Sequence, residues 1–266
     1  MSTRYQKIFR VLFFCLLCPI VLATISGITK NLITDWREHI LFVIAIGITY
    51  SLTMVFTKWE KLKLKNVGII PNKATFRRCI FGFGIGLFMT FLQLVFVLLF
   101  GHFTISYNLS ISYYTVIFYL TLYILVAIRE ELAFRSYPIF SLNYGFGFWK
   151  SQLIILLIFS IEHIVGGMTW QQAFLGSGAG ALLFGFAALR TKGIALPIGM
   201  HTAWNFGQWC FGFKKETGLI HGISEKGFEN IVDRNGWISY FLIMTIAIVC
   251  FNFYNPKNKL NSTLIK

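Results

Sequence analysis

The sequence has little charge, and most of that charge is of one sign. Only 13% of its 266 residues are charged, whereas 56% are hydrophobic, and 24 Lys and Arg stand against 10 Asp and Glu. A soluble domain has about 25% charged residues, so the chain has about half the charge that a water-facing surface requires. The high apolar content also excludes a disordered chain. The composition instead favours a protein whose outer surface faces lipid.

Cysteine is scarce as well, and its positions exclude a disulfide scaffold. The five cysteines lie in or beside apolar runs, at Cys15, Cys18, Cys79, Cys210 and Cys250. In such surroundings Cys usually behaves as a small hydrophobic residue. The first two form a C-x-x-C motif inside an apolar run, but the sequence has no second pair to complete a metal or redox site.

Long apolar runs are abundant. A helix that crosses a membrane needs about 20 mostly apolar residues. Runs of about this length cover residues 8–28, 40–57, 79–100, 111–128 and onward, 151–165, 172–189, 194–213 and 237–253. We therefore predict an all-α, polytopic membrane bundle of about eight transmembrane helices, which forms a single integral-membrane domain over residues 1–266.

The basic residues are distributed unevenly between the two sides of such a bundle. With eight spans, 16 Lys and Arg and one acidic residue lie on the side of the two termini, and six bases and six acids lie on the other side. The positive-inside rule therefore predicts that both termini are cytoplasmic. The bases are spread over several loops and do not form the contiguous surface that nucleic acid requires, so we predict no nucleic-acid partner.

Five charged residues lie within the apolar part of the chain: Arg129, Glu130, Glu131, Arg135 and Glu162. An ionisable side chain costs several kcal/mol in hydrocarbon, so each is a candidate for a functional site. Glu131 and Arg135 are four residues apart and share a helical face, where they can form an ion pair. Glu130 lies next to Glu131, and two adjacent carboxylates in a low dielectric do not both ionise freely, so one can act as a base towards water. The alternative is that residues 129–135 form a solvated cytoplasmic end of the fourth span.

Two later spans carry polar residues at helical spacing. Phe159 and His163 are four residues apart, and so are His201 and Asn205, so each pair lies on one helical face. A single intramembrane histidine is more often structural than catalytic. Three spans that each carry polar groups at this spacing favour a shared site.

These residues form three motifs that resemble those of a known family. EELAFR at residues 130–135 matches its EExxxR motif, FSIEH at 159–163 its FxxxH motif, and HTAWN at 201–205 its HxxxN motif, in the same order along the chain. The chain thus resembles the CAAX protease and bacteriocin-processing family of intramembrane endopeptidases, which includes the type II CAAX prenyl proteases. The resemblance covers a four-helix core at about residues 111–213 and leaves residues 1–110 and 214–266 as peripheral helices.

The resemblance implies a hydrolase that activates water with a glutamate. Glu130 is then the base, and His163 helps to hold the water. Glu131 and Arg135 position Glu130 and adjust its basicity.

The same resemblance implies an oxyanion hole and a class of substrate. His201 and Asn205 stabilise the tetrahedral intermediate, and Phe159 packs beneath His163. The substrate is a CAAX-like, lipidated or apolar peptide or protein that enters from the lipid bilayer or the cytoplasm. Short loops and a compact chain favour a bacterial plasma-membrane protein, in which a secreted peptide or self-immunity becomes the alternative to a lipidated protein.

This interpretation requires the fourth helix to be long. If it ended at Ile128, Glu130 would lie at the cytoplasmic surface, whereas His163 lies 13 residues beyond Lys150, or about 20 Å deeper. We therefore predict that the helix continues to about Ser141 or beyond, with Pro138 late in it as a possible kink.

A zinc protease is the main alternative mechanism. His163, His201 and a glutamate could together form a His2Glu zinc site. The H-E-x-x-H motif is absent, and Phe159 replaces the first His of H-x-x-E-H. We therefore predict a mechanism without a cofactor.

Other intramembrane proteases are excluded by what the spans lack. Ser177 follows Gly176 directly, so a Gly-x-Ser motif is missing, and no predicted span contains the Asp residues of an aspartyl protease. The remaining alternatives are a bacteriocin-immunity or signalling protein without catalysis, and a transporter. No inverted repeat of the motifs supports the transporter.

Overall fold

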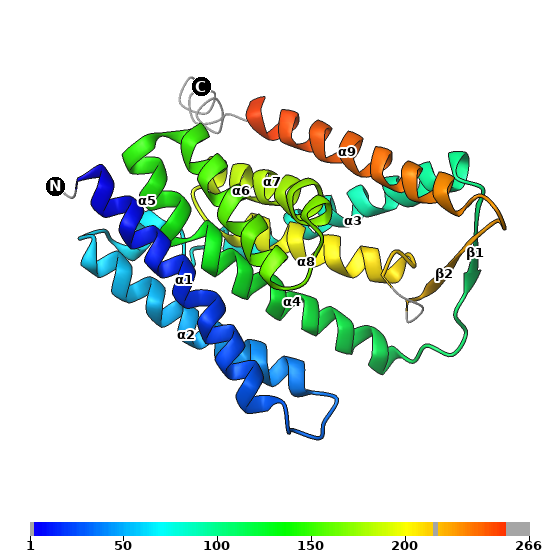
Figure 1. Cartoon of the computed structure of the whole chain (residues 1–266), viewed down its shortest axis with the longest axis horizontal. Coiled ribbons are helices and arrows are strands. Elements are labelled where there is room, and N and C mark those ends of the chain that lie inside the picture. The colour runs from blue at the N-terminus through cyan, green and yellow to red at the C-terminus, as the bar shows by residue number, and fades with distance from the viewer. Residues whose placement is uncertain (1–2, 215–217, 254–266) are drawn as a thin grey trace.

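The structure is a computed structural model that describes residues 3–214 and 218–253, and these form a helical bundle with one small β-ribbon (Figure 1). The helices are α1 (Arg4–Thr29), α2 (Arg37–Trp59), α3 (Thr75–Phe100), α4 (Tyr113–Arg135), α5 (Tyr137–Phe146), α6 (Phe148–Val165), α7 (Gly178–Thr191), α8 (Ala195–Cys210) and α9 (Glu229–Phe253). A 3₁₀ turn (Leu64–Val67) precedes α3, and a π-helical turn (Gln172–Ser177) leads into α7. The strands β1 (Phe103–Tyr107) and β2 (Ile220–Ser224) pair antiparallel, with Phe103 opposite Ser224. The ribbon is the part of the fold that the all-α prediction does not contain.

Most of the bundle is suited to a bilayer. Six described segments are long and apolar enough to cross a membrane, namely α1, α2, α3, α6, Gln172–Thr191 and α9. Their outer faces expose large apolar side chains, such as Phe81 at 65% and Leu99 at 70%. The prediction of a polytopic helical membrane protein is thus confirmed. Two of the eight expected spans, at α4 and α8, form helices as predicted but are not among these six membrane-crossing segments. The helix α8 has only 16 residues.

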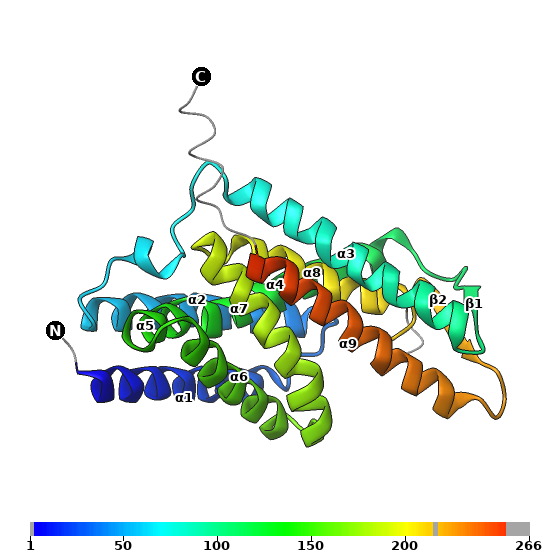
Figure 2. The same cartoon turned by 90° about the horizontal axis from the view of Figure 1, so that it is seen from above.

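The loops with the excess of basic residues meet at one end of the bundle, which we call the basic end. The guanidinium of Arg78, at the start of α3, donates to the Thr191 carbonyl at the end of α7 over 3.0 Å. Arg190 donates in turn to the Asn252 carbonyl near the end of α9 over 2.9 Å. The β1–β2 ribbon lies at the opposite end, which we call the ribbon end (Figures 1 and 2).

A buried glutamate ties three helices together at the basic end. Glu60 follows α2 and forms an ion pair with Lys7 of α1. Its other oxygen accepts hydrogen bonds from the hydroxyl groups of Tyr137 at 2.9 Å and Ser141 at 2.6 Å, both on α5. Hydrogen bonds to a charged group contribute about 1.5–3 kcal/mol each, so α1, α2 and α5 are firmly joined.

The fourth helix does extend past Glu130, but it is not continuous to Ser141. Ser136 has φ −97° and ψ −118°, which ends α4 at Arg135, and α5 then begins at Tyr137. Pro138 lies in the first turn of α5, where its missing N–H is not needed, so the predicted late kink is wrong. Because α5 continues the chain toward the basic end, Glu130 still lies deep in the bundle.

Close backbone packing fixes α8 against α3. A Cβ atom on Gly82 of α3 would lie 2.2 Å from the Leu196 carbonyl oxygen, and one on Gly199 of α8 would lie 2.0 Å from the Cys79 carbonyl oxygen. Only glycine permits this approach at these positions. The contact holds α8, with two of the candidate site residues, at a fixed depth.

Candidate active site

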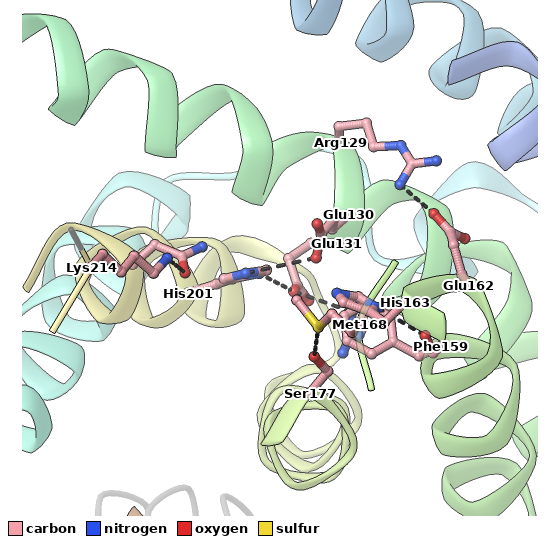
Figure 3. A network of polar contacts seen from close by, with 12 residues as sticks. Arg129, Glu130, Glu131, Phe159, Glu162, His163, Met168, Ser177, His201 and Lys214 are labelled. Atoms are coloured by element: carbon pink, nitrogen blue, oxygen red, sulfur yellow. Dashed lines mark hydrogen bonds and ion pairs between the residues drawn. The ribbon is translucent and has the colours of Figure 1, made fainter. Parts of the chain in front are cut away.

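The three motifs meet in one cavity of about 920 Å³ between α4, α6 and α8. Its lining includes Glu130, Phe159, His163, His201 and Asn205. Figure 3 shows the Glu130 and His163 side chains on facing elements of this site. The predicted requirement that Glu130 and His163 share one space is therefore met, and residues 129–135 do not form a solvated helix end.

The two adjacent glutamates have different surroundings. The Glu131 side chain is fully buried, and its Oε1 lies 2.9 Å from His201 Nδ1 and 3.5 Å from Arg135 Nη1. The Glu130 side chain remains 17% exposed, and its Oε2 lies 3.7 Å from His201 Nε2. Glu130 is therefore the carboxylate that can meet water in the cavity, whereas Glu131 is held inside the protein.

Arg135 lies in a box of aromatic rings. Its guanidinium carbon lies 4.4 Å from the ring centre of Phe159, 5.6 Å from that of Phe134 and 5.8 Å from that of Phe184. Phe184 also stacks on His201, with ring centres 4.8 Å apart. The guanidinium is thus held by its ion pair with a glutamate and by contact with ring faces, which favour a cation.

The orientation of His163 is set by its own helix. Its Nδ1 lies 2.9 Å from the Phe159 carbonyl oxygen, and its ring packs on the Phe159 ring at 4.2 Å. A carbonyl oxygen only accepts hydrogen bonds, so Nδ1 carries the proton and Nε2 of the neutral ring is an acceptor. The expected packing of Phe159 beneath His163 is confirmed.

Lys214 belongs to the site, although sequence reasoning placed it among the balanced charges of an outer loop. Its Nζ donates to Asn205 Oδ1 over 2.7 Å and lies 5.0 Å from the ring centre of Tyr123. Figure 3 shows Lys214 on the same side of the site as His201. Burial lowers the pKa of Lys214 from the ordinary 10.5 to about 8, although the charge of Glu130 raises it in part. Lys214 lies nine residues after Asn205 and outside every motif, so no spacing rule in the sequence indicates this contact.

Two of the five intramembrane charges serve a different purpose. Arg129 Nη1 lies 2.8 Å from Glu162 Oε1, and its Nη2 donates to the Cys18 carbonyl of α1 over 3.2 Å. Figure 3 shows Arg129 turned toward Glu162 and away from His201. Arg129 therefore joins α4 to α6 and α1, outside the residues that line the cavity.

A zinc site of the alternative mechanism requires at least three protein ligands that converge on one point. Within residues 3–214 and 218–253, no group of three or more His, Cys, Asp and Glu side chains is arranged to hold a metal ion. The Nδ1 atoms of His163 and His201 are both engaged with protein oxygens.

Comparison with known proteins shows that the segment carrying this site is similar to a known family. Residues 111–207 match the family model described as type II CAAX prenyl endopeptidase Rce1-like, and this range contains all three motifs. No curated protein matches the chain. The match confirms the resemblance that the motifs indicate.

Proposed function

From the match of residues 111–207 to the type II CAAX prenyl endopeptidase Rce1-like family, we propose that the chain hydrolyses peptide bonds within the membrane with Glu130 as the base. The match supports a hydrolase of the CAAX protease class. The observation that supports the finer proposal is the single cavity that Glu130 shares with His163, His201 and Asn205.

Glu130 and His163 activate the water. The Glu130 carboxylate accepts a proton while the water oxygen attacks the carbonyl carbon of the peptide. The His163 Nε2 lone pair accepts the second hydrogen of the water and orients it. When the tetrahedral intermediate collapses, the C–N bond breaks and Glu130 returns its proton to the leaving amine. Glu130 is therefore ionised again at the end of each cycle.

His201 and Asn205 stabilise the oxyanion. His201 Nδ1 is held by Glu131, so the ring can donate to the oxyanion from Nε2 when both of its nitrogens carry a proton. The Asn205 side-chain oxygen is occupied by Lys214, so its NH₂ group is free to donate. Loss of one oxyanion-hole donor typically reduces kcat by about 10²–10³. Arg135 does not contact the substrate in this proposal. It is a positioning residue that balances the buried charge of Glu131.

We propose that this chemistry needs no metal ion and acts on an apolar or lipidated peptide within the bilayer. The aromatic lining of the cavity, including Phe103, Phe213 and Trp237, suits an apolar peptide. A bacteriocin-immunity or signalling role without catalysis makes the opposite prediction for variants of Glu130.

The decisive comparison is between cells that carry the native chain and cells that carry Glu130→Gln. Membrane-associated peptides are measured in both by mass spectrometry, and we expect a product that is absent from the variant, because an amide cannot act as the base. Glu162→Gln is the matched control, since it alters an intramembrane glutamate outside the cavity lining. Equal peptide profiles and an unchanged phenotype in Glu130→Gln, at equal protein levels, would reject catalysis in favour of the non-catalytic role.

A further inference from the structure

The lining of the cavity extends from the catalytic motifs to the ribbon end of the bundle and to the segment between α6 and α7. Beyond the catalytic motifs, its lining continues to Phe103 of β1, Ser224 of β2, Lys214, and Asp233 and Trp237 of α9. The strands β1 and β2 and the start of α9 lie together at the ribbon end (Figures 1 and 2). Among the described residues that line it, none comes from the basic loops.

The opposite direction is filled by packed side chains. Between Glu130 and the basic end, Phe134, Tyr137, Ile139 and Leu142 are all fully buried. The first lies at the end of α4 and the other three on α5, whose polar Tyr137 is also bound to Glu60. A close-packed core of this kind leaves no passage for a peptide.

The charges identify which side each end faces. Lys and Arg greatly outnumber acidic residues in the loops of the basic end, whereas the loops of the ribbon end carry balanced charge. The positive-inside rule places the basic end in the cytoplasm. The mouth of the cavity then lies on the other side of the membrane.

From these observations we propose that the active site opens to the non-cytoplasmic side and acts on peptide segments exposed there, such as an exported peptide or an outward-facing segment of a membrane protein. The substrate part of this inference rests on the proposed function. The direction in which the cavity opens does not depend on catalysis. It departs from the expectation that a substrate enters from the cytoplasm. A lipidated cytoplasmic C-terminus does not fit this direction of access.

Accessibility of single cysteines tests the direction. In a variant whose five native cysteines are replaced, Ser177→Cys places a thiol in the cavity and Asp233→Cys places one at its mouth. Lys63→Cys places an exposed thiol at the basic end as the matched control. Intact cells are treated with a membrane-impermeant charged maleimide, and the labelling is repeated after permeabilisation.

We expect both cavity thiols to react in intact cells, and the control thiol only after permeabilisation. The reverse pattern would overturn the proposal by showing that the basic end faces outward. Labelling of Asp233→Cys without Ser177→Cys would overturn it by showing that the cavity is closed to that side. Repeating the labelling in Glu130→Gln separates the two proposals, since accessibility does not depend on catalysis.

The route of the substrate is tested by blocking the cavity. Modification of Ser177→Cys by the impermeant reagent in intact cells should abolish the product that depends on Glu130. Full modification with undiminished product would overturn the proposed route, and it would leave the catalytic role of Glu130 intact.

Discussion

Replacing Lys214 by Met should make the protein more stable and less active. The side chain is partly buried, and its ammonium group donates to Asn205 at 2.7 Å. Burial lowers the pKa of Lys214 from 10.5 to about 8 even though the charge of Glu130 opposes that effect. The folded protein therefore holds a charge where its surroundings disfavour one. Methionine has a similar length and no charge to desolvate.

The stability change follows from the pKa. A fall from 10.5 to about 8 corresponds to at most about 3.4 kcal/mol at pH 7, an upper bound because solvent screens a partly exposed ammonium. Between pH 8 and 10.5 the unfolded chain binds more protons at Lys214 than the folded chain does. The native protein should therefore gain stability as pH rises through this window. Lys214→Met should lack that gain and already have the higher stability at pH 7.

The activity change follows from the hydrogen bond. A hydrogen bond to a charged group contributes about 1.5–3 kcal/mol, which corresponds to roughly 10- to 150-fold in kcat if all of it serves to orient Asn205. The native rate should also fall as pH rises past about 8, when Lys214 loses its proton.

Two measurements on purified protein in detergent test this reasoning. The free energy of unfolding and the rate of product formation are each followed from pH 7 to 10.5, with Lys226→Met as a control at an exposed lysine. A variant that loses stability and rate together would show that Lys214 is merely structural. An identical pH dependence of unfolding in native and variant proteins would refute the argument from burial.

Three further predictions concern the core of the site. Arg135→Met leaves the buried charge of Glu131 unpaired and should reduce the free energy of unfolding, measured by denaturant titration, by about 3–5 kcal/mol. Adding Glu131→Gln should restore much of this loss. No restoration would contradict the pairing of Arg135 with Glu131. Gly199→Ala should destabilise the bundle by about 1–3 kcal/mol, because the new Cβ atom would lie 2.0 Å from a backbone carbonyl oxygen of α3. Gly84→Ala is the control: its Cβ atom would meet no atom within 4 Å, so the same assay should show little change in stability. Treatment with a chelator should leave the rate of product formation unchanged, and loss of activity that zinc restores would replace the glutamate mechanism by a metal-dependent one.

The sequence predicted the helices and the grouping of the site because both depend on periodic patterns. Apolar runs of about 20 residues indicate the spans directly. Spacing of four residues brings Glu131 and Arg135 together on one helix, and the structure confirms this contact at 3.5 Å. The family match over residues 111–207 includes all three motifs.

What the sequence did not reveal depends on contacts between distant segments. The helix break at Ser136 has no glycine, and Pro138 two residues later was interpreted as a kink inside one helix. The contact between Lys214 and Asn205 forms because the chain turns back after α8. The β1–β2 ribbon joins segments more than 100 residues apart, and strands as short as five residues give little periodic signal.

The link from Arg129 to the Cys18 carbonyl has a consequence for any attempt to isolate the catalytic segment. Cys18 lies far outside residues 111–207, so expressing that range alone would remove the α1 carbonyl that Arg129 uses inside the bundle. The same cut would remove Gly82 and with it the α3 surface against which α8 is seated. The part of the chain that carries the family motifs therefore depends on the preceding helices. Contacts with α1 and α3 hold α4 and α8 in the positions that form the active site.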